Sequence, residues 1–309
     1  MLTCKEKGYA KVNLFLNVTG KRDGYHMLDT VVTTINLFDT VTVTKRKDDK
    51  IVLKTSGSIY SLPTEDKDNN VYKAALKFQQ TYSTCGVDIT VKKNIPVASG
   101  LGGSSADIVA TLKAMAKLFD IKEDLKPIAD SLGSDAGYLL TGGYAKLSGR
   151  GDVVEKLDID KKLYFLIATL NSGVNTKECF DVYDSLQKGE NFENAGDGYP
   201  KKTSQTLIEN LKNGVVKRED FYNALYKPAC QVNPEISGVY GLIAQLSPDA
   251  ISMSGSGSSI FCIYSSKELC LWAKDKIKGK NLKVFVTESI DSKRINKKGL
   301  KSIYSISYD

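Results

Sequence analysis

A glycine-rich loop that runs directly into a helical pattern is the most constraining feature of this chain. Residues 94–107 read NIPVASGLGGSSAD, and apolar residues follow at helical spacing over 108–119. Glycines allow positive φ angles and a close approach of the backbone to a ligand, and the first amides of a helix have no internal partner. The residues concerned are Gly100, Gly102, Gly103, Ser104 and Ser105. Because such amides bind phosphate with the help of the helix dipole, the segment predicts an anion site.

The spacing in this loop excludes the two commonest nucleotide-binding motifs. A Walker A loop requires a lysine after its last glycine, and no lysine follows Gly103. A dinucleotide fingerprint requires Gly-x-Gly-x-x-Gly after a strand, which Gly100-Leu-Gly-Gly-Ser-Ser does not provide. A glycine-rich loop by itself is more often a turn or linker than a phosphate site, so its role has to be judged together with the rest of the chain.

Length and composition indicate a globular protein with two domains. The chain has 309 residues, of which 41% are hydrophobic and 26% charged, enough for two cores. We expect domains over residues 1–158 and 159–309. The apolar runs are too short to span a bilayer and the first residues lack a signal-peptide core, so we expect a cytoplasmic protein without a membrane partner. Six scattered cysteines and a single histidine argue against a zinc site and predict reduced, mostly buried thiols.

The net charge of +7 does not by itself select a partner. Lysines are spread along the chain, and the one basic cluster, residues 293–301, is short and predicts a solvated tail. A modest positive charge equally suits an enzyme whose substrates are small polyanions, because the field raises their local concentration. We therefore expect a small-molecule partner and no nucleic acid.

The periodicity of the chain predicts strands and helices in mixed blocks, which is typical of an α+β fold. The elements predicted for the N-terminal domain are strands 8–18, 39–45, 86–91 and 144–147, helices 70–82 and 125–132, the helix after the glycine loop, a turn at 20–24, and a segment over 135–143 that leads into a glycine-rich turn. The elements predicted for the C-terminal domain are a strand over 163–169, two helices, an exposed loop over 191–203, a small-residue loop and strand over 251–264, a helix over 266–276 and a strand over 283–287.

Two separate glycine- and serine-rich loops together with an N-terminal Lys-Val-Asn strand resemble the GHMP kinase superfamily. Within it the chain most resembles the family of 4-diphosphocytidyl-2-C-methyl-D-erythritol kinases, from about Ala10 to about Tyr264. The most specific segment is residues 10–30, AKVNLFLNVTGKRDGYHMLDT, because other superfamily members share its Lys-x-Asn but lack its Gly-Lys-Arg-x-Gly-Tyr-His-x-Leu. The resemblance implies a two-domain GHMP kinase fold, with an N-terminal domain like domain 2 of ribosomal protein S5 and a ferredoxin-like C-terminal domain.

The resemblance implies an ATP- and Mg²⁺-dependent kinase of the non-mevalonate route to isoprenoid precursors, which phosphorylates the C2 hydroxyl of a cytidyl diphosphate substrate. Asp135 is implied to accept the hydroxyl proton, and Lys11 to orient Asp135 and neutralise charge at the transferred phosphoryl group. From the residue types alone, a helix N-cap stays open for Asp135 and an exposed strand lysine for Lys11. Ser105 is the candidate Mg²⁺ ligand, and we expect a monomer or a homodimer.

The resemblance also implies two sets of binding residues. The set for ATP is Asn69, which faces adenine, Lys93, Pro96, Gly100, Leu101, Gly102, Gly103, Ser104 and Ser105. The set for the cytidyl substrate is Asn13, Tyr25, His26, Thr176, Phe180, Gly255, Ser256 and Gly257. Tyr25 and Phe180 are implied to stack on the two faces of cytosine, and the imidazole or the backbone of His26 to hydrogen-bond its edge, whereas the sequence alone leaves His26 an ordinary core or surface histidine. Met253 and Trp272 are expected to be packing residues.

The chain departs from the family pattern at four positions, which leaves the substrate open. Ser104 stands at the family's third glycine and Ala106 at its second serine, and Ala136 and Gly137 replace Val-Pro. The alternative is a kinase of the same superfamily that acts on mevalonate, homoserine or a sugar, although such substrates carry no base to stack on the aromatic residues. The alternative from a different class is a catalytically idle module that binds nucleotides or nucleic acid, which the retention of both implied catalytic residues disfavours.

Overall fold

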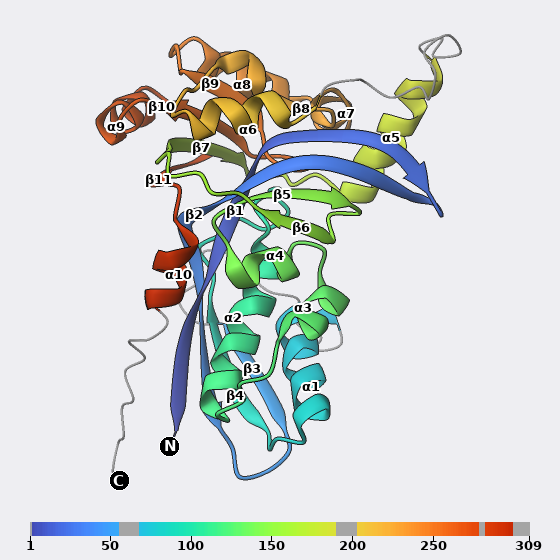
Figure 1. The fold of residues 1–309 in the computed structure, drawn as a ribbon, viewed down its shortest axis with the longest axis vertical. Coiled ribbons are helices and arrows are strands. Elements are labelled where there is room, and N and C mark those ends of the chain that lie inside the picture. The colour runs from blue at the N-terminus through green and yellow to red at the C-terminus, as the bar shows by residue number, and fades with distance from the viewer. Residues whose placement is uncertain (1, 56–67, 190–202, 278–281, 299–309) are drawn as a thin grey trace.

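A long β-hairpin forms the spine of the molecule in the computed structural model, which describes residues 2–55, 68–189, 203–277 and 282–298 (Figure 1). Its antiparallel strands are β1 (Thr3–Arg22) and β2 (Tyr25–Lys45). The turn residues Asp23 and Gly24 both have positive φ angles, 51° and 81°, as expected of a two-residue Asp-Gly hairpin turn. The turn was therefore predicted correctly, but the strand predicted at residue 39 begins at Tyr25. Residues 30–35 are buried on both faces, so this part of β2 lacks the alternation that marks a half-buried strand.

Among the described residues, seven strands form the first sheet, in the order β3-β4-β2-β1-β8, with β5 also paired to β2 and β6 paired to β5. The strands besides the hairpin are β3 (Ile51–Thr55), β4 (Val87–Lys92), β5 (Tyr144–Gly149), β6 (Val153–Lys156) and β8 (Tyr222–Asn223). β4 pairs with residues 40–45 of β2 and β5 with residues 28–33, so these two strands share one edge of β2. The short strand β8 comes from the C-terminal half of the chain and pairs in parallel with β1.

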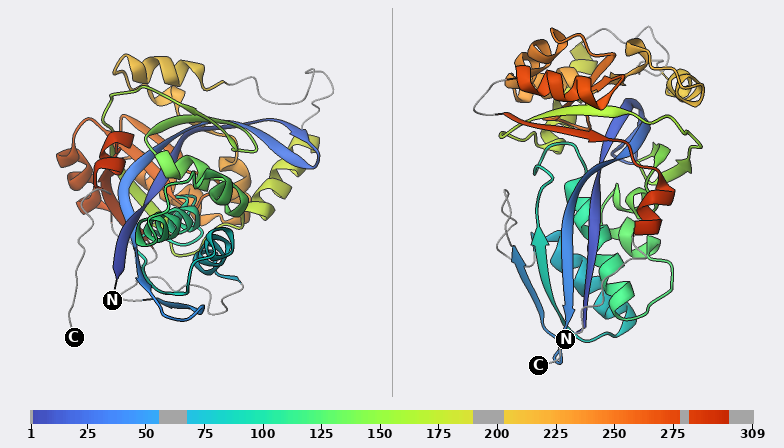
Figure 2. Two further views of the ribbon diagram at one scale, coloured as in Figure 1. Left: turned by 60° about the horizontal axis from the view of Figure 1, so that its bottom comes forward. Right: turned by 90° about the vertical axis from the view of Figure 1, so that its left-hand side faces the viewer.

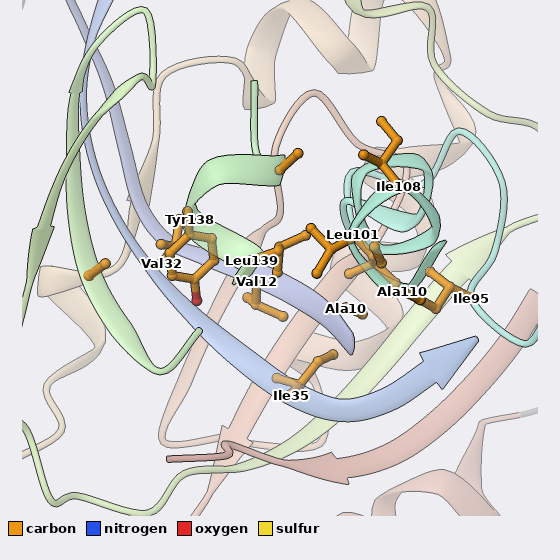
Figure 3. Packing of buried hydrophobic residues seen from close by; sticks show 14 of the residues in the cluster. Ala10, Val12, Val32, Ile35, Ile95, Leu101, Ile108, Ala110, Tyr138 and Leu139 are labelled. Atoms are coloured by element: carbon orange, nitrogen blue, oxygen red, sulfur yellow. The ribbon is translucent and has the colours of Figure 1, made fainter. Parts of the chain in front are cut away.

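Four helices cover one face of this sheet, at the end of the molecule that lies away from the second sheet (Figures 1 and 2). They are α1 (Asn70–Tyr82), α2 (Gly103–Leu118), α3 (Lys126–Leu132) and α4 (Ala136–Thr141). The segment predicted to lead into a glycine-rich turn forms the short helix α4, and Gly142 and Gly143 after it have positive φ angles. Figure 3 shows part of the core between these helices and the sheet, to which the hairpin contributes Val12 and Ile35, α2 contributes Ile108 and α4 contributes Tyr138. α2 lies so close to β1 that a side chain on Gly8 would overlap the backbone of α2.

The second sheet has four described strands in the antiparallel order β11-β7-β10-β9. They are β7 (Tyr164–Leu170), β9 (Ala250–Met253), β10 (Ile260–Tyr264) and β11 (Leu282–Glu288). The helices of this half are α5 (Thr176–Gly189), α6 (Gln205–Lys212), α7 (Tyr226–Val232), α8 (Glu235–Ala244) and α9 (Lys267–Lys276), with a 3₁₀ turn at Arg218–Asp220. Four of these helices, α5 to α8, lie between β7 and β9, where two helices were predicted. The loop predicted over 191–203 lies outside the described residues apart from its last one.

The two halves share core residues. Leu16 and Val18 of β1 pack in the core of the second sheet, and Phe165 and Phe261 of the second sheet belong to the core of the first. Of the segment predicted as a solvated tail, residues 293–298 belong to helix α10 (Ser292–Lys298), which contacts α4 and buries Ile295, and the rest lies outside the described residues. The prediction of a tail is wrong there because that isoleucine finds an apolar site. The α+β fold is confirmed, and the boundary at residue 158 stays a prediction.

Burial agrees with the sequence at most of the residues expected to pack. Met253 is wholly buried, and the six cysteines are free thiols of which most are buried. Trp272 is 47% exposed on α9, so the expectation that it packs in the core is wrong. Among the described residues, no helix combines the length and hydropathy needed to cross a bilayer.

Candidate active site

One cavity of about 890 Å³ is lined by the glycine loop, the hairpin and helix α5, and its volume suits a small-molecule ligand. Every residue that the sequence predicted for the site lines it: Lys11, Asn13, Tyr25, His26, Asn69, Lys93, Pro96, Gly100, Leu101, Gly102, Gly103, Ser104, Ser105, Asp135, Thr176, Phe180, Gly255, Ser256 and Gly257. The fold therefore brings together residues that lie in both halves of the chain. Their roles in binding and catalysis stay predictions.

The glycine loop ends at the exposed amides of helix α2. Gly100 and Gly102 have φ angles of 78° and 71°, and Gly102 is the N-cap of α2, where no described side chain accepts a capping hydrogen bond. The free first amides are what an anion site requires. The prediction that Gly103 also needs a positive φ is wrong, because Gly103 is already the first residue of the helix. Its lack of a side chain serves close packing instead, since a Cβ atom there would lie 3.0 Å from Ile95 Cγ2.

The second small-residue loop locks the first in place through Ser254, a residue that the sequence did not single out. The Ser254 hydroxyl donates to the Gly100 carbonyl at 2.9 Å and accepts from the backbone amide of Asn13 at 3.1 Å. A side chain on Gly100 would also overlap the backbone of Ser254, so this position excludes a Cβ atom by packing as well as by φ. The signal for Ser254 is its place inside the motif that already supplied Gly255 and Ser256.

Lys11 and Asp135 form an ion pair inside the cavity. Lys11 Nζ lies 3.3 Å from Asp135 Oδ2 and donates to Asn13 Oδ1 at 2.5 Å. The Asn13 side chain is held in turn by a hydrogen bond from its Nδ2 to the Thr30 hydroxyl at 2.9 Å. Lys11 is buried, which excludes the alternative of an exposed strand lysine. Asp135 occupies the N-cap position of α4, but its side chain makes no capping hydrogen bond and contacts Lys11 instead.

A buried group of three charged side chains holds the start of the glycine loop through hydrogen bonds to its backbone. Lys93, only 2% exposed, pairs with Asp39 and lies 2.6 Å from Asp107. Asp39 also accepts hydrogen bonds from the backbone amides of Asn94 at 2.5 Å and Ile95 at 2.9 Å, the residues that open the loop. Burial lowers the pKa of Lys93, but the charges of Asp107 and Asp39 outweigh burial and raise that pKa overall. Burial raises the pKa of Asp107, and the negative charge of Asp39 adds to this rise, so that Lys93 offsets it only in part.

The sequence predicted Lys93 as an ATP contact, and the structure adds that its ammonium is engaged by carboxylates that the sequence did not assign to the site. Asp107 could have been found from its place at the start of the loop's helix, whereas nothing near Asp39 in the sequence marks it.

The N-terminus of helix α1 meets the loop at the same cavity. Asn69 is buried, and its Oδ1 accepts from the Val71 amide at 2.9 Å, which makes it the N-cap of α1. The next residue, Asn70, was not predicted for the site, and its side-chain amide donates to the Ser104 hydroxyl. The serine that replaces the family's third glycine thus has a partner on α1.

Aromatic side chains of the hairpin tip and of α5 line another part of the cavity. The hairpin tip lies beside α5 (Figure 1). The rings of His26 and Phe180 stack directly, with centroids 4.5 Å apart and planes at 22°. Phe180 thus contacts His26 in this structure, whereas the implied sandwich places cytosine between Phe180 and Tyr25 and stays a prediction. Tyr25 is 56% exposed, and the Arg150 guanidinium lies 4.8 Å from the centre of its ring.

Known proteins resemble this chain along almost its whole length. A family model for the GHMP kinases N terminal domain matches residues 69–153. A 4-diphosphocytidyl-2-C-methyl-D-erythritol kinase of Clostridium beijerinckii is 33% identical over 293 residues, covering 93% of this chain and 100% of the relative. The enzyme of that name from Caldicellulosiruptor bescii is 32% identical over 295 residues, covering 93% of this chain and 96% of the relative.

Solved structures share the fold. A crystal structure of a 4-(cytidine 5'-diphospho)-2C-methyl-D-erythritol kinase superposes with a TM-score of 0.77 at 24% identity, covering 92% of this chain and 98% of the other. A homoserine kinase from Cytophaga hutchinsonii superposes with a TM-score of 0.67 at 21% identity, covering 93% and 95%. The architecture is therefore common to kinases with different acceptors, and the acceptor has to be argued from the site.

Proposed function

Since this chain belongs to the family of 4-diphosphocytidyl-2-C-methyl-D-erythritol kinases within the GHMP kinases, we propose that it catalyses the reaction for which that family is named. The reaction transfers the γ-phosphoryl group of ATP to the C2 hydroxyl of 4-diphosphocytidyl-2-C-methyl-D-erythritol, in the non-mevalonate route to isoprenoid precursors. The observation that carries the proposal is a single cavity lined by the Lys11–Asp135 pair, the glycine loop and the aromatic hairpin tip.

The glycine loop brings a bound triphosphate next to the ion pair. A Cβ atom on Gly102 would lie 3.0 Å from Lys11 Cγ and 3.5 Å from Asp135 Oδ2, so the loop backbone passes directly beside both side chains. The free amides at the start of α2 hold phosphate oxygens. Lys11 then neutralises charge at the transferred group while it stays 3.3 Å from the carboxylate that it orients.

Asp135 acts as the general base. Its carboxylate accepts the proton of the C2 hydroxyl while the hydroxyl oxygen forms a bond to the γ-phosphorus. The bond from that phosphorus to the β,γ-bridging oxygen breaks at the same time, and ADP leaves. Phosphoryl transfer needs little covalent chemistry from the protein, so positioning and charge neutralisation by these residues supply most of the acceleration.

Oxygen donors in the cavity fit a Mg²⁺ ion held together with the nucleotide. Mg²⁺ prefers oxygen ligands and is usually bound by one or two protein groups plus substrate phosphates. The Ser105 side chain lines the cavity, and Asp107 Oδ1 is buried and has no hydrogen-bond partner among the described residues. No group of three His, Cys, Asp or Glu side chains in the described ranges suits a metal, so the protein alone does not form a cage. We assign Ser105 and Asp107 as the protein ligands of an ion that would neutralise the triphosphate.

A substrate panel tests the proposed reaction. ADP release is measured with ATP, Mg²⁺ and one acceptor at a time: the cytidyl substrate, mevalonate, homoserine and galactose. We expect turnover with the cytidyl substrate and a kcat/KM for the other three at least about 10³-fold lower, since a site built to pair with a polar group rejects ligands that lack it. Preference for another acceptor would overturn the substrate assignment. ATP binding without turnover of any acceptor would instead support an idle nucleotide-binding module. Asp135→Asn is the control for contaminating kinases.

The cellular setting follows from the same proposal. An enzyme that uses ATP and a small cytidyl diphosphate works in the cytoplasm, as a monomer or homodimer, and needs no nucleic acid. Light scattering after size exclusion measures the oligomeric state, and RNA binding with a steep salt dependence would contradict the absence of nucleic acid.

A further inference from the structure

Asp184 on helix α5 joins two residues of the hairpin tip. Its Oδ1 lies 2.6 Å from His26 Nε2, and its Oδ2 lies 2.6 Å from Lys21 Nζ. The same helix surrounds the imidazole with two aromatic rings, because Phe180 stacks on it and Tyr183 meets it edge-on at 6.2 Å. His26 lines the cavity, whereas Asp184 lies behind it. The imidazole is therefore held by contacts from a single element.

The chemistry of this contact fixes where the ring carries its proton. Burial raises the pKa of Asp184, but hydrogen bonds from His26 and Lys21 outweigh burial and hold that pKa below its usual value. An ionised carboxylate accepts hydrogen bonds and donates none. His26 Nε2 must therefore carry a hydrogen and donate it to Asp184. In the neutral imidazole this leaves Nδ1 as the only acceptor on the ring.

We propose that Asp184 is a positioning residue that holds His26 with its proton on Nε2 and so gives the acceptor site a hydrogen-bond acceptor at Nδ1. The proposal rests on the proposed function, since it concerns the same acceptor. A hydrogen-bond acceptor on the protein suits a base that presents an amino group. Cytosine carries a donor amino group at N4, whereas uracil has a carbonyl acceptor at that position. Asp184 thus acts through His26 on the choice between the two pyrimidines.

The contact with Lys21 supports a competing role for the same carboxylate. Asp184 could clamp the hairpin tip to α5 without any influence on the imidazole. Lys21 is 42% exposed, so its pair with Asp184 is screened by solvent and weak. The two roles differ in one respect: a clamp through Lys21 acts whether or not residue 26 is a histidine, whereas positioning requires the ring.

The chain has one histidine, which makes the proton position directly measurable. With ¹⁵N-labelled histidine, NMR at pH 8 gives a single imidazole whose two nitrogen shifts report which one is protonated. We expect the Nε2–H form in the wild type and a mixture of both tautomers in Asp184→Ala. Ser185→Ala, which changes the next residue on the exposed side of α5, is the matched control and should resemble the wild type. An Nδ1–H or doubly protonated ring in the wild type, or an unchanged spectrum in Asp184→Ala, would overturn the proposal.

Steady-state kinetics tests the consequence for the substrate. Asp184→Ala should raise KM for the cytidyl substrate about 5- to 50-fold, with KM for ATP unchanged and kcat within about threefold of wild type. The ratio of kcat/KM for the cytidyl substrate to that for its uridyl analogue should fall by a similar factor. In a His26→Ala background, Asp184→Ala should have no further effect. A loss that persists in that background and is reproduced by Lys21→Met would establish the clamp and overturn the positioning role.

The two proposals fail differently. A wild-type protein that does not phosphorylate the cytidyl substrate removes the proposed function, and the NMR result still decides whether Asp184 sets the proton position. A wild-type protein that turns the substrate over, with a KM that Asp184→Ala does not change, removes the positioning role and leaves the function intact.

Discussion

The two ends of the cavity are built in opposite ways. At the phosphate end, the loop conformation is fixed by glycine backbone angles and by the buried charges of Lys93, Asp39 and Asp107. At the acceptor end, half-exposed side chains on the hairpin tip and α5 form the wall, and Asp184, 26% exposed, joins them. The first end resembles a protein interior, and the second resembles an interface between two elements.

This difference separates chemistry from recognition. Groups that must stabilise a transition state gain from a rigid and partly desolvated setting, where electrostatic interactions are strong. Groups that select a substrate only need to contact it, and changes there alter affinity without touching the reacting atoms. We expect substitutions at the phosphate end to change turnover, ATP binding or stability, and substitutions at the acceptor end to change mainly KM for the cytidyl substrate.

The largest effect is expected for Asp135→Asn. The amide keeps the shape of the carboxylate but cannot accept the hydroxyl proton, so kcat should fall about 10²- to 10⁴-fold. ATP affinity, measured by calorimetry, should stay nearly unchanged. A variant that keeps more than about half of the wild-type kcat would leave Asp135 as a residue of the α4 terminus without a catalytic role.

Lys93→Met should destabilise the fold strongly, because it leaves Asp39 and Asp107 buried without their counter-ion. Loss of one partner from a buried ion pair typically lowers the free energy of unfolding by about 3–5 kcal/mol. Lys126→Met is the control, since Lys126 forms an exposed pair with Asp130 on α3 and should cost less than about 0.5 kcal/mol. Similar midpoints of urea unfolding for both variants would show that the phosphate end is no more rigidly built than the surface.

Gly102→Val should weaken ATP binding about 10- to 100-fold, because a branched side chain at a φ of 71° strains the loop by about 1–3 kcal/mol. The control is Gly214→Val. Gly214 has nearly the same φ, 73°, and nothing lies near its missing side chain. Both variants should lose stability, but only Gly102→Val should change the dissociation constant of ATP by calorimetry. Equal ATP affinity in the two variants would mean that the loop has a structural role only.

Phe180→Ala should raise KM for the cytidyl substrate about 5- to 100-fold with little change in KM for ATP, because it removes a stacking surface of about 1–3 kcal/mol. The structure sharpens the reason, since Phe180 stacks on His26 and also supports that ring. Trp272→Ala, at an exposed aromatic residue on α9, is the control and should change neither KM. An equal rise in both KM values for Phe180→Ala would break the division between the two ends.

The smallest effect is expected from low pH on the stability that Asp184 contributes. The pKa of Asp184 is held below its usual value, so its contacts stabilise the folded state above the pKa of an unfolded aspartate and are lost as pH falls through the folded value. The difference in unfolding free energy between wild type and Asp184→Ala should shrink as pH falls below the usual carboxyl range. A difference that does not change across that range would show that these contacts do not depend on the charge of Asp184.

Much of the fold could be predicted from short-range patterns. The Asp-Gly turn, the helix after the glycine loop and the central strands of the second sheet were found because periodicity and turn chemistry act over a few residues. The pattern did not reveal the first half of β2, and it predicted only two of the four helices between β7 and β9. A strand buried on both faces loses its alternation, and short helices carry too few turns for a clear period.

The sequence by itself determined the local conformation of the phosphate loop and the set of residues that line the cavity, the latter through a motif shared with known kinases. Only the tertiary structure decided which side chains support them. Lys93 pairs with Asp39 across 54 residues, Ser254 reaches Gly100 across 154, and Asp184 reaches His26 across 158. It also decided that the ring of Phe180 stacks on that of His26, a contact that the sequence did not predict. Backbone angles depend on neighbouring residues, whereas these contacts depend on how the hairpin, the loops and α5 pack, which no local pattern records.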